Sequence, residues 1–212
     1  TPTLLFFDEQ GGVALRLNGY MPPERFRVAL DYASKRLEKK QSFTEYLAAS
    51  TPGKGGLAAQ PFLARGAPEL PRLLKAGKPV IVLFEQKVCR ECQEMHRVGF
   101  KRPEVAKLLE RFTVVQLDLA GTRKVVTPAG KATTERDWAR ASRVVYAPSL
   151  VFLDTAGKEV FRAEGYLKPF HLASALDYVA GGAYRREPNF QRFVQKRADD
   201  LRAAGHKVEL WD

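Results

Sequence analysis

Residues 78–92 read K-P-V-I-V-L-F-E-Q-K-V-C-R-E-C. The uninterrupted apolar run at Val80–Phe84 is typical of a central strand that is covered on both faces. Cys89 follows this strand at the expected start of a helix, and Cys92 stands three residues further on. A C-x-x-C pair in this position favours redox chemistry over a purely structural role for the two cysteines.

The two cysteines are expected to have different roles. A helix N-terminus presents unpaired N–H groups and a positive potential, which favour thiolate over thiol at Cys89 by about 0.3–2 kcal/mol. Cys92 lies one turn inside the helix, where it can close a disulfide while staying shielded. We therefore interpret Cys89 as the nucleophile and Cys92 as the resolving thiol, with no cofactor beyond their disulfide. Arg90 and Glu91, which tune the motif, carry opposite charges that are expected largely to cancel.

Other interpretations of the cysteine pair stay open. A C-x-x-C can be half of a zinc site, and His96 on the same helix could be a third ligand. Zinc usually has four ligands, however, and the chain has only two cysteines. A structural disulfide that closes so short a loop would add little stability. We therefore favour redox use over a metal-binding module and expect no metal.

Length and composition indicate a globular protein. The chain has 212 residues, 45% of them hydrophobic, and a net charge of +11, which is enough for one large domain or two small ones. No apolar stretch approaches the eighteen or so residues of a membrane span. The basic residues of the C-terminal part are interrupted by Asp199 and Asp200, so a solvated helix face is favoured over a nucleic-acid partner. Residues 1–8 do not have the pattern of a signal peptide.

An internal repeat decides the expected organisation. Thr1–Ser34 aligns without a gap on Ala147–Ala180, with P-T-L-L-F-F-D-E-Q-G-G on P-S-L-V-F-L-D-T-A-G-K. The cysteines have no counterpart before the first copy. We interpret the chain as the back half of a first domain (residues 1–50), a linker rich in Gly, Pro and Ala (51–68) and a complete domain with an extra C-terminal helix (69–212).

Hydrophobic periodicity predicts the order of elements. Each copy is expected to form a strand, a tight turn, a strand and a helix, and in the first copy the helix is expected from about Pro23 to Lys39. The complete domain is predicted to be α/β, with parallel strands joined by a helix and an antiparallel hairpin added. The expected strands are Leu4–Phe7, Val13–Leu17, Val80–Phe84, Phe112–Leu119, Leu150–Leu153 and Val160–Ala163. The expected helices of the second unit are Leu70–Lys75, one that follows Cys89 and is interrupted near Pro103, Thr134–Ser142 with Thr133 or Thr134 as its cap, one through Phe170–Val179, and Asn189–Ala204.

Residues 78–92 align without a gap on the strand and active-site turn of thioredoxins. C-x-x-C-x-x-M-H from Cys89, Pro103-Glu104-Val105 and F-T-V-V-Q-L-D-L at 112–119 closely resemble the SoxW-like group of bacterial periplasmic thioredoxins. So do G-K-A-T-T-E at 130–135, the segment from Ala147 to Val160, and the turn from Gly165 to Pro169. The resemblance covers most of 79–197.

This resemblance implies a thioredoxin fold and dithiol–disulfide exchange with protein substrates. It implies a periplasmic location, recharging by a membrane electron carrier, and a link to sulfur metabolism or envelope proteins. It also implies that Pro148 is a cis-proline facing the active-site turn and that the backbone of Ala147 pairs with an extended substrate segment. Pro2 would be the counterpart of Pro148 in the first copy.

Several positions depart from the thioredoxin pattern. Leu83 stands where many thioredoxins bury an Asp, Val88 replaces Trp, and Arg90-Glu91 replaces Gly-Pro. The reduction potential and the direction of exchange are therefore left open. Glu85, two residues past Leu83 on the same strand face, is a candidate for proton transfer or a solvated charge at the strand end, and we expect the solvated charge.

Two further expectations concern the whole chain. A rival interpretation is a tandem binding or assembly module in which the cysteines are incidental. The hairpin and helix of residues 1–50 should leave an unpaired edge and an apolar stripe, because the half that would cover them is not in this sequence. We therefore expect this segment to belong to a longer tandem protein and to pack on a separate polypeptide or a second copy.

Overall fold

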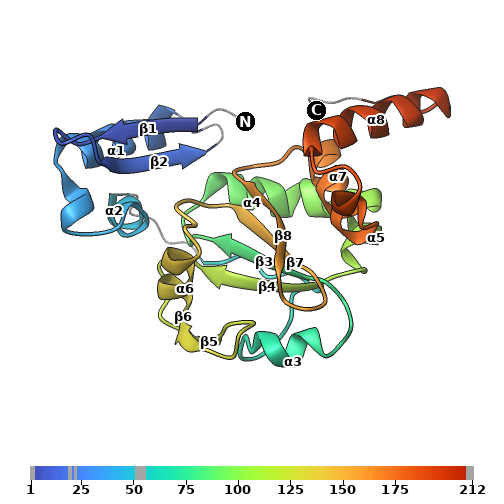
Figure 1. The fold of residues 1–212 in the computed structure, drawn as a ribbon, viewed down its shortest axis with the longest axis horizontal. Helices are drawn as coiled ribbons and strands as arrows, with labels where there is room; N and C mark the ends of the chain where they lie inside the picture. Colours follow the sequence, from blue (N-terminus) through green and yellow to red (C-terminus); the bar gives the residue numbers. More distant parts are fainter. Residues whose placement is uncertain (1–2, 19–20, 22, 51–55, 209–212) are drawn as a thin grey trace.

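The computed structural model describes residues 3–18, 21, 23–50 and 56–208. Its centre is a four-stranded mixed sheet in the order β4-β3-β7-β8 (Figure 1). The strands are β3 (Val80–Glu85), β4 (Thr113–Asp118), β7 (Ser149–Leu153) and β8 (Glu159–Glu164). Strand β3 is parallel to β4 and antiparallel to β7. All six residues of β3 are buried, as the apolar run predicts for a central strand.

Helices cover both faces of this sheet. Alternate β3 side chains point to opposite faces, so Ile81 and Leu83 pack with Met95 and Leu172 on one face. The helices of that face are α4 (Arg90–Arg97), α5 (Pro103–Leu109) and α7 (Pro169–Ala180). The long final helix, α8 (Phe190–Ala203), packs on α7.

The other face holds the cysteines. Val82 and Phe84 pack there in one apolar cluster with Cys89 and Cys92. The elements that cover this face are α3 (Leu70–Leu74), α6 (Glu135–Ala141), and a small hairpin of β5 (Lys124–Val126) and β6 (Ala132–Thr134).

The structure confirms the predicted elements of the second unit and contains one further hairpin that was not predicted. The helix after Cys89 is broken before Pro103, as expected. Of the two proposed caps, Thr134 is the one used, because its Oγ1 accepts a hydrogen bond from the Asp137 N–H at 3.2 Å. The sequence did not predict β5 and β6, whose strands are only three residues long.

Residues 3–50 form a separate unit with its own small sheet and core. Strands β1 (Thr3–Phe7) and β2 (Val13–Asn18) pair with each other as the predicted hairpin. The apolar cluster of the unit consists of Leu15, Leu17, Ala29, Tyr32, Phe43 and Leu47. It is distinct from the two clusters that flank the central sheet.

The expected helix to Lys39 is too long. Helix α1 spans Pro23–Ser34, and the chain then turns at Arg36, which has a left-handed backbone conformation with φ of 53°. A 3-10 turn and a second helix, α2 (Phe43–Ser50), follow. The helix ends because a left-handed residue cannot continue a right-handed helix.

The same local contacts recur in the two aligned copies. The Tyr32 hydroxyl donates to the carbonyl oxygen of Gln41 at 2.6 Å, and the aligned Tyr178 hydroxyl donates to that of Glu187 at 2.7 Å. Arg36 aligns with Gly182, which is also left-handed. These parallels agree with the interpretation of residues 1–50 as half of a second unit, which stays a prediction with its boundaries. Pro2, the expected counterpart of Pro148, lies outside the described residues.

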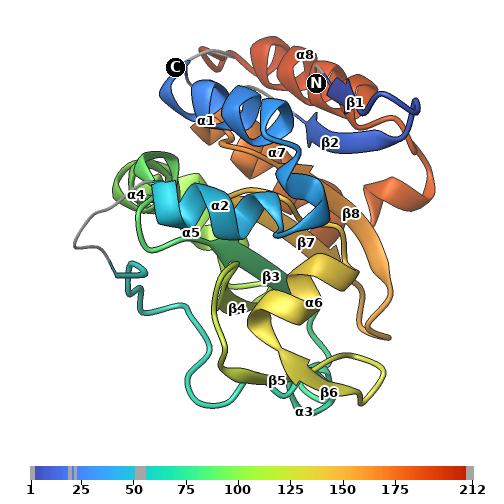
Figure 2. The same ribbon diagram turned by 90° about the vertical axis from the view of Figure 1, so that its left-hand side faces the viewer.

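The unit of residues 3–50 lies beside the end of β3, close to the start of α4 and its cysteine pair (Figures 1 and 2). Its hairpin keeps large apolar side chains in solvent: Phe7 is 61% and Val13 57% exposed. The sequence did not predict that α1 and α2 would contact the chain's own second unit. Packing of the hairpin on a separate polypeptide or a second copy stays a prediction. In the described part of the chain, no helix is both long and apolar enough to cross a membrane.

Candidate active site

Cys89 and Cys92 form a disulfide at the start of helix α4, with their Cα atoms 5.2 Å apart. Cys89 is the N-cap residue of this helix, and its Sγ accepts a hydrogen bond from the Cys92 N–H at 3.1 Å. The first N–H groups of a helix have no partner within the helix and carry its positive end. The predicted position of the pair is thus confirmed, and the backbone is placed to stabilise negative charge on the Cys89 sulfur.

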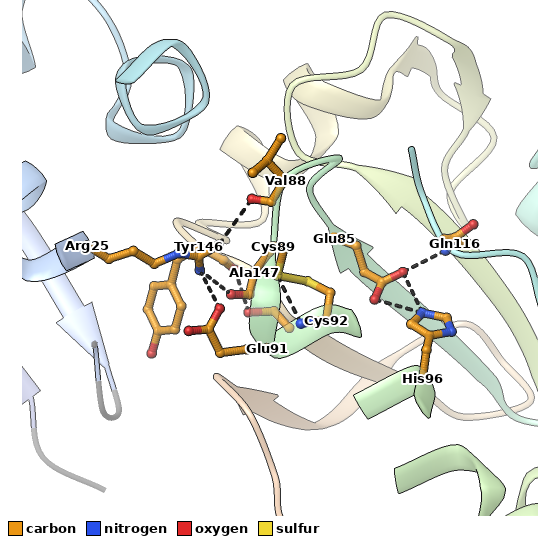
Figure 3. Close-up of a disulfide and its surroundings, with 11 residues drawn as sticks. Arg25, Glu85, Val88, Cys89, Glu91, Cys92, His96, Gln116, Tyr146 and Ala147 are labelled. Carbon is orange, nitrogen blue, oxygen red and sulfur yellow. Dashed lines mark hydrogen bonds and ion pairs between the residues drawn. A yellow bond between two sulfur atoms is a disulfide. The ribbon is translucent and has the colours of Figure 1, made fainter. Parts of the chain in front are cut away.

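The loop that precedes β7 lies next to the disulfide (Figure 3). The Ala147–Pro148 peptide bond is cis, as the family resemblance implied. Ala147 packs in the same apolar cluster as both cysteines. The structure therefore brings Ala147, the residue before Pro148, together with Cys89 and Cys92, as expected for three of the predicted site residues.

Arg25 of helix α1 reaches into this site and was missed by the sequence reasoning (Figure 3). Its Nη1 donates to the carbonyl oxygen of Ala147 at 3.0 Å and lies 3.4 Å from a carboxylate oxygen of Glu91. Its Nη2 donates to the carbonyl oxygen of Val88 at 3.4 Å. One guanidinium thus contacts Val88 before the cysteine pair, Glu91 between the two cysteines, and Ala147 before Pro148.

The sequence did contain a signal for Arg25. Arg25, Ala29 and Tyr32 are the buried residues of α1, at the spacing of one helix face. A charged residue within an apolar stripe needs polar partners when it is buried. That rule predicts a partner for Arg25 but does not identify it, because the partners are distant in the sequence.

The charges inside the cysteine motif do not cancel as expected. Arg90 is exposed, whereas the Glu91 side chain is 17% exposed and pairs with Arg25. The expectation failed because it considered only neighbours in the sequence.

Glu85 is buried, so the expected solvated charge is wrong. Both of its carboxylate oxygens lie 2.9 Å from Nε2 of His96, and one accepts a hydrogen bond from the Gln116 side chain at 2.6 Å. Strand β3 is covered up to this last residue, where Glu85 is 1% exposed. A buried carboxylate is tolerated when hydrogen bonds replace water. Figure 3 shows Glu85 turned toward His96 and Gln116.

His96 contributes to this buried polar cluster and not to a group with the two cysteines. Its ring packs edge-on against Phe100, with the ring centroids 5.0 Å apart. Within the described ranges, no group of three or more His, Cys, Asp and Glu side chains is placed to hold a metal ion. The structure therefore does not assemble Cys89, Cys92 and His96 into the alternative metal site.

Helix α2 makes a second set of contacts near the cysteine pair. The Gln86 side chain donates to the carbonyl oxygen of Thr44 at 3.4 Å. The carboxylate of Glu45 lies 3.4 Å from Arg136 and 3.3 Å from Arg140 of α6. Hydrogen bonds from Ser42, together with these two arginines, lower the pKa of Glu45 from its ordinary value of 4.5.

The surroundings leave almost no sulfur surface in solvent. Cys89 is 2% exposed and Cys92 is 4% exposed. Because a thiol must reach a disulfide sulfur to exchange with it, this burial bears directly on reactivity.

Comparisons with known proteins agree with this geometry. DsbD of Pectobacterium atrosepticum, a thiol:disulfide interchange protein, is 28% identical over 88 residues, which are 42% of this chain and 14% of that protein. The chain thus matches only a small part of that relative's length.

Solved structures are also similar to this chain. A thioredoxin-fold protein from Helicobacter pylori has a TM-score of 0.52 and 13% identity, over 68% of this chain and 92% of the other. A thioredoxin from Thermus thermophilus has a TM-score of 0.43 and 28% identity, over 58% and 95% of the two chains. The sequence model of a family described as "Thioredoxin-like domain" matches residues 1–34 and 68–180, more than half of the chain. The chain therefore belongs to the thioredoxin-like domain family.

Proposed function

We propose that this chain is a thiol–disulfide oxidoreductase that exchanges a dithiol for a disulfide with protein substrates through Cys89 and Cys92. The observation that supports this most is the place of the disulfide: its first sulfur is at a helix N-cap and accepts the Cys92 N–H. This arrangement favours the thiolate, which is the reactive form in exchange.

In the direction of substrate reduction, the Cys89 thiolate attacks one sulfur of a substrate disulfide. A Cys89–substrate bond forms, and the other substrate sulfur leaves as a thiolate. Cys92 then loses its proton and attacks the Cys89 sulfur, which releases the second substrate thiol and forms the Cys89–Cys92 disulfide. Two electrons pass to the substrate, and the reverse sequence oxidises a substrate dithiol.

Substrate binding is assigned to the loop of Ala147 and Pro148. The resemblance to thioredoxins supports pairing of the Ala147 backbone with an extended substrate segment, a form of β-augmentation. The nearness of this loop to the disulfide supports the assignment.

The finer assignment follows the SoxW-like resemblance. We propose that the protein works in the bacterial periplasm, is recharged by a membrane electron carrier, and serves sulfur-metabolism or envelope proteins. Fractionation of the native host, with trapped partners identified from the periplasmic fraction, would test this assignment. Recovery of the protein only in the cytoplasm would contradict it.

Reduction of insulin by dithiothreitol tests the proposed activity. The wild-type protein should accelerate the reaction, and Cys89→Ser should be no faster than buffer. An Arg192→Ala variant serves as a control, because Arg192 is exposed on α8, outside the cysteine motif. Equal rates for wild type and Cys89→Ser would instead favour the rival binding or assembly module.

A further inference from the structure

The surface that a partner would need is occupied by the chain itself. We propose that the unit of residues 3–50, here called the cap, is an intramolecular occupant of the partner-binding surface, held there by Arg25. A partner would gain access to the disulfide only when the cap moves away. This inference rests on the proposed function for its meaning, but its test does not require a protein substrate.

Arg25 occupies polar groups that surround the disulfide. Its three acceptors are the carbonyl oxygen of Val88, the carboxylate of Glu91 and the carbonyl oxygen of Ala147. The Ala147 carbonyl is a backbone acceptor that an extended partner segment would use. While Arg25 donates to it at 3.0 Å, a partner N–H must compete for the same oxygen.

The second step concerns access to sulfur. Thiol–disulfide exchange requires the attacking sulfur to contact the sulfur that it attacks. Cys89 is 2% exposed, and Arg25 of the cap donates to the carbonyl oxygen of Val88, the residue before it. In this arrangement a protein thiol cannot reach the Cys89 sulfur without displacing its neighbours.

The third step concerns how the cap is held. Besides Arg25, Thr44 of the cap contacts Gln86, and Glu45 contacts Arg136 and Arg140. The two arginine side chains of α6 are 37% and 57% exposed, and ion pairs in solvent are weak. The cap also has its own apolar cluster, which consists of residues of the cap itself.

The test measures how fast a small reductant opens the Cys89–Cys92 disulfide. Arg25→Ala should raise the rate of reduction by dithiothreitol at least about tenfold, because one charge-assisted contact no longer holds the closed state. Arg27→Ala is the matched control, since Arg27 is exposed on the same helix. It should leave the rate unchanged. The reduction rate of Arg25→Lys should fall between those of wild type and Arg25→Ala, because the lysine ammonium lacks the planar fork with which arginine reaches three acceptors.

The sign of the effect separates the cap from simple electrostatics. Loss of a positive charge beside the disulfide would by itself slow attack by an anionic thiolate. A slower Arg25→Ala protein, or one equal to Arg27→Ala, would therefore overturn the proposal.

A second variant tests whether the cap moves as a unit. Glu45→Ala breaks the weaker α2 contacts at a site outside the cysteine motif and should accelerate reduction by a smaller factor than Arg25→Ala does. Acceleration in Arg25→Ala without any in Glu45→Ala would overturn the cap, because Arg25 would then act on the disulfide alone. If both variants accelerate reduction by dithiothreitol but neither variant reduces insulin, the cap stands and the proposed function falls.

Discussion

At the scale of single residues, Cys89 and Cys92 differ in ways that assign their roles. Cys89 is at the helix N-cap, whereas Cys92 is inside the first turn and donates its N–H to the Cys89 sulfur. Cys89→Ser should abolish exchange, and Cys92→Ser should accumulate mixed disulfides because nothing resolves them. Mass spectrometry of trapped adducts should find them on Cys89. Adducts formed mainly through Cys92 in the reciprocal variant would show that the roles are reversed.

The buried carboxylate of Glu85 leads to a second prediction. Glu85→Ala should lower the free energy of unfolding by about 1–3 kcal/mol, because the buried His96 side chain loses its partner and Gln116 loses one of its two acceptors. Urea unfolding measures this loss, and Glu110→Ala, at an exposed position, should stay within about 0.5 kcal/mol of wild type.

The role of Glu85 in proton transfer is tested by a conservative change. Glu85→Gln should slow turnover by less than ~100-fold, the lower end for a positioned acid–base group. A greater loss, with normal unfolding, would give Glu85 a larger catalytic part than we assign to it.

Residue patterns predicted some of the site and not the rest. The cysteine pair was readable because its spacing and its position after an apolar strand lie within fifteen residues of sequence. The burial of Glu85 could not be predicted, because its partners His96 and Gln116 come from a helix and from a neighbouring strand. Arg25 was missed for the same reason, since its acceptors on Val88 and Ala147 lie 63 and 122 residues further along the chain.

At the scale of elements, helix ends depend on single backbone conformations. Gly182 lies two residues after the end of α7 and has a left-handed φ of 67°. An added Cβ there would meet nothing within 4 Å. Gly182→Ala should therefore destabilise by about 1–2 kcal/mol through conformation alone. Gly56→Ala is the control, because that position also has open space and no left-handed φ. Equal thermal unfolding of the two variants would contradict this account.

The link between α2 and α6 should respond to pH through Glu45. Hydrogen bonds from Ser42 lower the pKa of Glu45 below its ordinary value of 4.5 in the folded protein. A group with a lowered folded pKa stabilises the fold above its unfolded pKa, and the contribution is lost as pH falls through the folded value. The contacts of Glu45 with Arg136 and Arg140 should therefore weaken below about pH 4.5.

A phosphine reductant, which works in acid, measures this effect. The rate of disulfide reduction in wild type, divided by that in Glu45→Gln, should be lowest near pH 6 and should rise toward one as the solution is acidified. A ratio that does not change with pH would contradict the link.

Element prediction succeeded where periodicity was long and failed at the ends. The strand at Val80–Phe84 and the helix through Phe170–Val179 were predicted because their apolar patterns span a whole element. The early end of α1 was missed because Arg36 is not a glycine, although it adopts the conformation of Gly182.

At the scale of the whole molecule, the two copies of the repeat differ in the strands that pair with them. Strand β7 has β3 on one side and β8 on the other, whereas β1 pairs only with β2 among the described strands. Phe7 and Val13 are left in solvent. Packing of this hairpin on a separate polypeptide or a second copy therefore stays a prediction.

The central claim is that Cys89–Cys92 is a redox-active pair and not a structural disulfide. Equilibration in glutathione buffers, followed by quantification of the reduced and oxidised protein, gives its reduction potential. Redox-active pairs of this fold range from about −270 mV in thioredoxin to about −120 mV in DsbA, and we predict a value within that range. The position within it would also assign the direction of exchange. A potential below about −300 mV, typical of structural disulfides, would contradict the account.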